Sequence, residues 1–205
     1  MSFREIARRL GAGKIKKAIL SANLQAALPN KIRSRSPLWI HFGCGDIADA
    51  RFLNVDARLF PHVDYVTNSP AMPAMPSDAA DMLYACHVFE HIPFRKQRDV
   101  LARWHEILKP GGTLMLSVPD FDKVAGPYCR GESTLQQVQS ILMGAQDYPG
   151  NFHFAIFTKE HLSMLLAKAG FSAVKEWHPD QRQNWPRDWS WEESVSLNLC
   201  AVRTA

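Results

Sequence analysis

The sequence predicts an α/β fold in which short strands form a mostly parallel sheet within one domain. From Leu38 onward, short apolar segments alternate with segments of helical periodicity, which is typical of a parallel α/β sheet. The first apolar segment also runs into closely spaced glycines, at the kind of position where such sheets bind nucleotides. A length of 205 residues with 46% hydrophobic residues suits a single domain with a sizeable core.

The apolar segments set the expected elements in order. The expected strands cover residues 38–42, 52–55, 63–66, 80–85, 113–118, 171–177 and 195–202. A helix over 94–108 places its apolar residues on one stripe and ends before Lys109-Pro110-Gly111-Gly112. Thr158 is expected to cap a second helix that stops at Gly170. Residues 121–157 are expected to be an irregular insertion over the active site, with one helix near 133–143.

The basic residues are concentrated in an N-terminal arm, residues 1–36, ahead of a domain that covers 37–205. The arm holds nine Lys/Arg against one Glu, a net charge of +8, whereas the domain holds 15 basic and 19 acidic residues. A nucleic-acid partner is therefore not expected, since enzymes that act on nucleic acids are usually basic around their active sites. Apolar residues at helical spacing predict a cationic amphipathic helix broken near Gly11 and Gly13. Two interpretations stay open: a solvated helix packed on the domain, or contact with an anionic membrane.

The cysteines and the hydropathy of the chain bear on its compartment. The four cysteines lie far apart without a C-x-x-C pair, so a disulfide framework or thiolate zinc site is not indicated. No apolar run reaches the roughly 18 to 20 residues that span a bilayer. We therefore expect a cytoplasmic protein, peripheral at most to the inner face of the membrane.

The loop after the first strand indicates a nucleoside ligand without a pyrophosphate. Gly43-Cys44-Gly45 allows close approach of the backbone to a ligand. Asp56 follows Gly45 by only 11 residues, whereas the dinucleotide fingerprint places its acidic residue roughly 20 residues on, so a nicotinamide oxidoreductase is disfavoured. Asp56 is expected to accept hydrogen bonds from ribose hydroxyls, the alternative being a simple turn or cap residue.

Several motifs carry a resemblance to a known family over roughly residues 38–203. They are Ile40-His41-Phe42-Gly43-Cys44-Gly45, Asn54-Val55-Asp56, Asp81-Met82-Leu83-Tyr84, Phe89-Glu90-His91, Leu108-Lys109-Pro110-Gly111-Gly112, Ser117-Val118-Pro119-Asp120 and Ala169-Gly170-Phe171. In this order they resemble the class I methyltransferases that use S-adenosylmethionine (SAM). The resemblance implies a Rossmann-like, seven-stranded methyltransferase sheet, mostly parallel with an antiparallel last strand. It is closest to a bacterial subgroup with a short first loop that is often associated with surface-polysaccharide or other glycan metabolism.

The resemblance also implies a cofactor site for SAM. The residues that it assigns to the cofactor are Phe42, Gly43, Cys44, Gly45, Asp56, Asn68, Ser69 and His87. The glycine loop would pass the methionine and ribose portions, Asp56 would bind the ribose, and Asn68 with Ser69 would face the adenine edge. Asn68 replaces the usual Asp, so its contact to the adenine amino group lacks charge assistance. His41 likewise replaces an acidic residue that many members carry before the loop.

Four side chains are candidates for the acceptor side: His87, Glu90, His91 and His153. The first three have i, i+3, i+4 spacing and would share one face of a helix. Similar Glu-x-x-Glu-His runs hold a divalent ion in ubiquinone O-methyltransferases and small-RNA 2′-O-methyltransferases, and His153 resembles a later histidine of the RNA enzymes. Here His87 stands where those runs begin with Glu. Pocket lining, a metal site and a metal-free general base remain as interpretations, and a metal is not expected by default.

The predicted function is SAM-dependent methylation, with an oxygen of a glycan or small metabolite as the expected acceptor and a nitrogen as the less favoured one. A non-catalytic, methyltransferase-like accessory protein in a biosynthetic assembly is the alternative. Trp185, Trp189 and Trp191 could stack on sugar rings, although large aromatic residues usually pack in a core. Asp147 and Tyr148 are either substrate contacts or turn residues.

Overall fold

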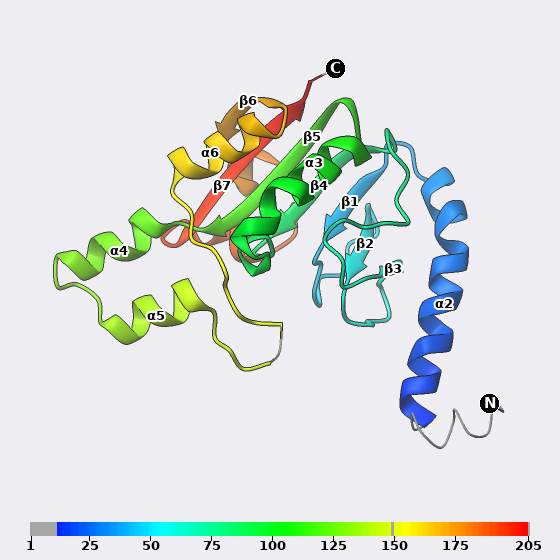
Figure 1. Ribbon diagram of the computed structural model, residues 1–205, viewed down its shortest axis with the longest axis horizontal. Coiled ribbons are helices and arrows are strands. Elements are labelled where there is room, and N and C mark those ends of the chain that lie inside the picture. The colour runs from blue at the N-terminus through cyan, green and yellow to red at the C-terminus, as the bar shows by residue number, and fades with distance from the viewer. Residues whose placement is uncertain (1–11, 149, 205) are drawn as a thin grey trace.

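The computed structural model describes residues 12–148 and 150–204, and its centre is one seven-stranded sheet (Figure 1). The strand order is β3-β2-β1-β4-β5-β7-β6. The strands are β1 (Trp39–Phe42), β2 (Phe52–Asp56), β3 (Tyr65–Val66), β4 (Ala80–Cys86), β5 (Leu108–Pro119), β6 (Phe171–Glu176) and β7 (Ser196–Arg203). The first five pair in parallel, while β7 runs antiparallel to both β5 and β6. This confirms the predicted fold class.

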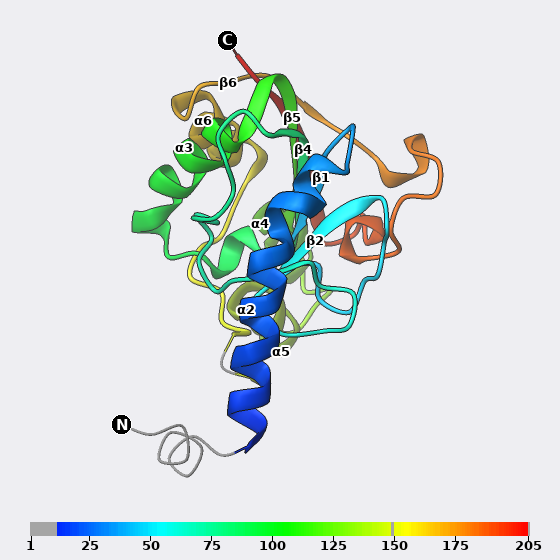
Figure 2. The ribbon, with the colours of Figure 1, turned by 90° about the vertical axis from the view of Figure 1, so that its right-hand side faces the viewer.

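Helices cover the sheet unevenly. They are α2 (Ala12–Arg33), α3 (Gln97–Ile107), α4 (Phe121–Cys129), α5 (Leu135–Met143) and α6 (Lys159–Lys168), with short 3₁₀ turns η1 (Phe89–His91), η2 (Phe94–Lys96), η3 (Pro179–Gln181) and η4 (Trp189–Trp191). Figure 2 shows α3 and α6 on one face of the sheet and the segment between β6 and β7 on the other. The α4–α5 pair projects beyond the strands (Figure 1).

Both faces of the sheet are buried, but by different kinds of cover. On the α3 face, Trp104 is fully buried and contacts the rings of Phe42 and Phe89. On the other face, the short connection between β1 and β2 forms no helix, and the β6–β7 segment supplies Trp177 and Trp185 instead. Both indoles pack edge-on against Tyr84 of β4. The core interpretation therefore holds for Trp185, which replaces helical cover that the short loop cannot provide.

The insertion differs from the prediction of an irregular segment with one helix. Asp120 accepts a hydrogen bond from the Asp122 amide and caps α4, a helix that contains Pro127. Thr134 and Gln137 form a capping box at the start of α5. The prediction missed α4 because a proline inside a short segment usually argues against a helix.

Two boundaries also differ from the prediction. The third strand contains only Tyr65–Val66, at the edge of the sheet. The residues Lys109–Gly112 were expected to be a loop, yet they belong to β5, where Gly111 has φ +81°. Lys109 Nζ lies 2.8 Å from both Asp81 carboxylate oxygens, so an ion pair to β4 holds this stretch against the sheet.

Helix α2 docks on the β3 edge of the sheet through its last turns (Figure 1). Leu28 is buried there, and Lys31 and Arg35 both pair with Asp64, at 2.6 and 3.2 Å. The expected break is absent at Gly13, which lies inside the helix, while Gly11 and the residues before it lie outside the described residues. The helix is not amphipathic, because its apolar residues are spread around it. Within the described residues, no helix combines the length and apolar character that a membrane crossing needs.

Candidate active site

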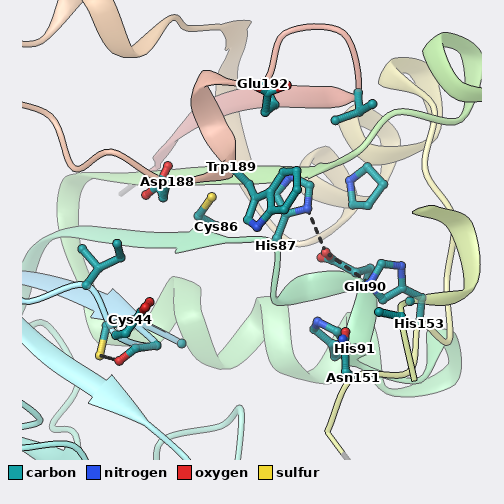
Figure 3. A pocket seen from close by; sticks show the side chains of 18 of the residues that line it. Cys44, Cys86, His87, Glu90, His91, Asn151, His153, Asp188, Trp189 and Glu192 are labelled. Atoms are coloured by element: carbon teal, nitrogen blue, oxygen red, sulfur yellow. Dashed lines mark hydrogen bonds and ion pairs between the residues drawn. The ribbon is translucent and has the colours of Figure 1, made fainter. Parts of the chain in front are cut away.

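A cavity of about 1100 Å³ opens at the carboxyl ends of the central parallel strands. Its walls come from the loop after β1, the turn after β4, the end of α5 with the loop behind it, and the segment before β7. Figure 3 shows this cavity with Cys44 and Asp188 on one side and Glu90, His91 and His153 on the other. The predicted glycine loop and the predicted acceptor-side residues therefore line the same space.

The glycine loop requires glycine at its first position. Gly43 has φ +71°, and a Cβ added there would overlap Cγ2 of Val88 and lie 3.1 Å from its Cγ1. The loop is held by three backbone amides: those of Gly43 and Cys44 donate to the Val55 carbonyl, and that of Gly45 donates to Asp56 Oδ2 at 2.8 Å. The backbone of Gly43–Gly45 is thus fixed against β2 and exposed to the cavity.

Asp56 is buried at the end of β2, and its carboxylate shapes the loop. Besides Gly45, it accepts a hydrogen bond from the Arg58 amide at 2.7 Å and faces the Arg58 guanidinium at 3.3 Å. It does not line the cavity, and neither do Phe42, Asn68 and Ser69. Phe42 packs on Trp104, Asn68 is exposed, and Ser69 is half-buried. Of the residues assigned to the cofactor, the cavity brings together Gly43, Cys44, Gly45 and His87.

The residues after β4 do not form the expected helix. His87 has φ +48° and precedes the 3₁₀ turn η1, so the chain turns sharply at the end of the strand. Its Nε2 lies 2.8 Å from the Ser196 hydroxyl, which in turn donates to the Trp189 carbonyl at 2.7 Å. Since that hydroxyl proton is already used, His87 Nε2 carries a proton and donates it. The lone pair on His87 Nδ1 then faces Glu90 Oε1, 3.4 Å away.

His91 and His153 meet Glu90 from the other side. The two imidazole rings lie edge to face with centroids 4.8 Å apart, and His153 Nε2 is 3.9 Å from Glu90 Oε1. His91 Nδ1 donates to the Phe152 carbonyl at 3.0 Å, which leaves its Nε2 as an acceptor. Glu90, His91 and His153 each offer one potential ligand atom, and these atoms lie within 4.8 Å of one another.

Burial makes this cluster electrically neutral near pH 7. Glu90 is fully buried, its two oxygens have no hydrogen-bond partner, and burial raises its pKa to about 8. Burial lowers the pKa of His87 to about 3 and that of His153 to about 4, and it also lowers the pKa of His91. The close approaches between Glu90 and the imidazoles are therefore contacts between neutral groups.

Asp188, which no sequence motif indicated, lies at the end of the cavity away from Glu90, His91 and His153. Its Oδ2 accepts a hydrogen bond from the Tyr84 hydroxyl at 2.7 Å, and its Oδ1 accepts from the amide and hydroxyl of Ser190 at 3.0 and 2.6 Å. The expected antiparallel last strand could have indicated this residue. An antiparallel β7 begins at the edge where the parallel strands end, so the residues before it lie at the cavity.

Aromatic and charged side chains complete the outer wall. Trp189 is 60% exposed, and its ring lies 5.8 Å from that of His87. The Arg187 guanidinium stacks 3.8 Å over the Trp191 ring. Tyr148 also lines the cavity, whereas Asp147 does not and instead accepts a hydrogen bond from Asn151.

Several solved structures with similar folds are described as methyltransferases. The 1,6-didemethyltoxoflavin-N1-methyltransferase of Burkholderia thailandensis, solved with 1,6-didemethyltoxoflavin and S-adenosylhomocysteine, is 16% identical; the match covers 89% of this chain and 77% of that chain, with a TM-score of 0.53. A SAM-dependent methyltransferase from Archaeoglobus fulgidus is 13% identical over 89% of this chain and 94% of its own, with a TM-score of 0.54. Another from Thermotoga maritima is 14% identical over 98% and 99%, with a TM-score of 0.52. At these identities the likeness concerns the fold.

The family itself is shown by the sequence. No curated protein matches the sequence closely enough to count. A family model described as a methyltransferase domain matches residues 14–176, which is most of the chain. This match and the fold confirm the predicted family and the predicted methyl donor. The chain therefore belongs to the methyltransferase-domain family, as a class I methyltransferase that uses SAM.

Proposed function

We propose that the protein transfers the SAM methyl group to a hydroxyl oxygen of a glycan or small metabolite. The observation that carries this proposal is the neutral cluster of His87, Glu90, His91 and His153 on the same cavity as the glycine loop. The sulfonium of SAM is already activated, so the protein must align donor and acceptor and remove the acceptor proton. A neutral imidazole beside the acceptor supplies the second requirement.

The methionine portion of SAM is placed along Gly43, Cys44 and Gly45, where the loop leaves its backbone open to the cavity. Asp56 is proposed for the ribose: it lies behind the cavity lining, but its Oδ2 accepts only the Gly45 amide and can take a second hydrogen bond, whereas Oδ1 is used by Arg58. Asn68 and Ser69 are kept as candidates for the adenine edge. Phe42 does not face the cofactor; its ring packs against Trp104 and supports the strand that carries the loop.

His91 is the best-placed general base. Its Nδ1 proton is engaged by the Phe152 carbonyl, so the Nε2 lone pair is the one available to an acceptor hydroxyl. The same carbonyl would stabilise the imidazolium that forms when the proton arrives. Glu90, protonated near neutral pH, can donate a hydrogen bond to His87 Nδ1 or to the acceptor, and His153 closes the site from the α5 side.

A divalent cation at the same cluster is a second candidate. Glu90, His91 and His153 would hold it, and the two unpartnered Glu90 oxygens fit a cation because a buried carboxyl group otherwise lacks a partner. Two imidazoles and one carboxylate suit zinc, manganese or iron better than magnesium. When bound, such an ion would lower the pKa of an acceptor hydroxyl.

The test is methyl transfer from labelled SAM to a panel of oligosaccharides, glycolipids and small hydroxyl metabolites, read by product mass spectrometry. We expect a mass gain of one methyl group on an oxygen, and a loss of about 10²- to 10⁴-fold in rate in a His91→Ala, His153→Ala double variant. Calorimetric binding of S-adenosylhomocysteine by both proteins is the control. Full activity of the double variant would contradict the role given to the cluster.

Chelation separates the two versions of the mechanism. A metal-free base predicts that activity survives chelator treatment, whereas the cation version predicts loss and recovery on adding zinc, manganese or iron. Binding of S-adenosylhomocysteine without transfer to any acceptor would favour the accessory-protein alternative instead.

A further inference from the structure

We propose that Asp188, together with His41, binds the α-ammonium group of the methionine portion of SAM. This assignment rests on the placement of that portion along Gly43–Gly45 proposed above, and it does not depend on the identity of the acceptor. The ammonium is a cation with three N–H donors, so its site needs an anion and further acceptors held in place.

Asp188 is an oriented carboxylate on the glycine-loop side of the cavity. The hydrogen bonds from Tyr84 and Ser190 use three of its roughly four acceptor positions and fix its direction. Figure 3 shows Asp188 on the same side of the cavity as Cys44 and away from Glu90, His91 and His153. The remaining acceptor capacity of Asp188 is therefore available to a ligand on that side of the cavity.

His41 supplies an independent observation. Its side chain is 1% exposed and lines the cavity, and its Nδ1 has no hydrogen-bond partner within the described structure. His41 and Tyr84 are paired neighbours on β1 and β4, and their rings lie 4.9 Å apart. A buried, unpartnered ring nitrogen is costly unless a ligand fills the role of partner. Burial lowers the pKa of His41 to about 4, so the ring is neutral and can accept a hydrogen bond from the ammonium group.

The other acidic residues on the cavity are less suitable. Glu90 is buried among imidazoles at the acceptor end, and burial raises its pKa to about 8. Asp46 and Glu192 are exposed, where water competes for a cation and screens its charge. Strand β1 itself presents His41 rather than a carboxylate, so the negative charge has to come from another element. The segment before β7 provides it.

The test compares three ligands by isothermal titration calorimetry. S-adenosylhomocysteine carries the ammonium, its deaminated analogue keeps the carboxylate only, and 5′-methylthioadenosine lacks both groups. For Asp188→Asn we expect a roughly 10- to 100-fold weaker affinity for S-adenosylhomocysteine, with the affinities for the other two ligands unchanged. Glu192→Gln, a charge removal elsewhere on the cavity, should change none of the three.

Each outcome decides the assignment. Unchanged affinity of Asp188→Asn for S-adenosylhomocysteine would overturn it. An equal loss for all three ligands would also overturn it, because it would show a structural role for Asp188. If Asp188→Asn unfolds, Tyr84→Phe serves instead: it keeps the carboxylate but removes one orienting bond, and a selective loss for S-adenosylhomocysteine is again required. None of these results depends on finding an acceptor, so failure of the proposed function is seen separately.

Discussion

Replacing Gly43 by Ala tests whether the glycine loop is shaped by its fit against Val88. The added methyl group would overlap Val88 Cγ2 and lie 3.1 and 3.2 Å from Cγ1 and Cβ. The left-handed φ of +71° costs about 1–2 kcal/mol for an alanine. Overpacking adds about 1–3 kcal/mol. Reduced freedom of the unfolded chain returns less than about 1 kcal/mol. We therefore expect a loss of about 2–4 kcal/mol in the free energy of unfolding.

The same chain offers matched controls for the two contributions. Gly111 has φ +81° with no atom within 4 Å of an added Cβ, so Gly111→Ala reports the backbone cost alone, about 1–2 kcal/mol. Adding Val88→Ala to Gly43→Ala removes the overlapping methyl group and should restore part of the loss. Urea denaturation of the four proteins gives the free energies of unfolding. Equal destabilisation by Gly43→Ala and Gly111→Ala would refute the packing argument.

Three further predictions concern pH, the docked helix and the arm. The free energy of unfolding should fall as the pH drops from about 6.5 to about 4, because His41 binds a proton in the unfolded chain but stays neutral when buried in the folded protein. The loss approaches about 3 kcal/mol. In a urea-denaturation pH series, a His41→Asn variant should lack this part of the pH dependence. Burial is the largest influence on the pKa of His41. The negative charges of Asp188, Asp49 and Asp56 raise this pKa in part, and His62 lowers it further. Leu28→Ala should cost about 2–4 kcal/mol in the same denaturation assay if α2 is part of the core, and a cost below about 1 kcal/mol would show loose docking. Deleting residues 1–11 should weaken salt-sensitive binding to anionic vesicles while S-adenosylhomocysteine still binds, if this end of the arm contacts lipid. Equal sedimentation of both proteins with vesicles would exclude that role for residues 1–11.

Strands β1, β2, β4 and β5 were predictable because most of their residues are apolar, which suits strands that are buried on both faces. The short third strand was overestimated, since only Tyr65 and Val66 pair at the edge of the sheet. Helix α4 was missed because its Gly126 and Pro127 oppose a helix locally, whereas the Asp120 cap and burial of Val124 favour it. Tertiary contacts decide such segments, and local preference alone does not reveal them.

The candidate site was predictable where parallel strands end, and less so elsewhere. Gly43 and His87 follow β1 and β4, which are neighbours in the sheet, so their meeting at one edge follows from the topology. The expectation that His87, Glu90 and His91 share one face of a helix was wrong, because His87 has φ +48° and lies before the 3₁₀ turn that contains the other two residues. Asp188 could be predicted only by knowing that the segment before β7 lies over the cavity, and no short sequence motif indicates this.

The cavity separates its charges in a way that suits a sulfonium donor. A protonated imidazole at the acceptor end would repel the cationic sulfonium and could not accept a proton, so burial that keeps His87, His91 and His153 neutral serves both requirements. Glu90 stays protonated for the same reason, so it does not hold the imidazoles in their charged form. An ionised carboxylate is useful only where the cofactor carries a separate positive charge, and Asp188 lies on the side of the cavity away from Glu90, His91 and His153. Neutral proton acceptors at one end and a fixed anion at the other would orient SAM along the cavity with its methyl group toward the acceptor.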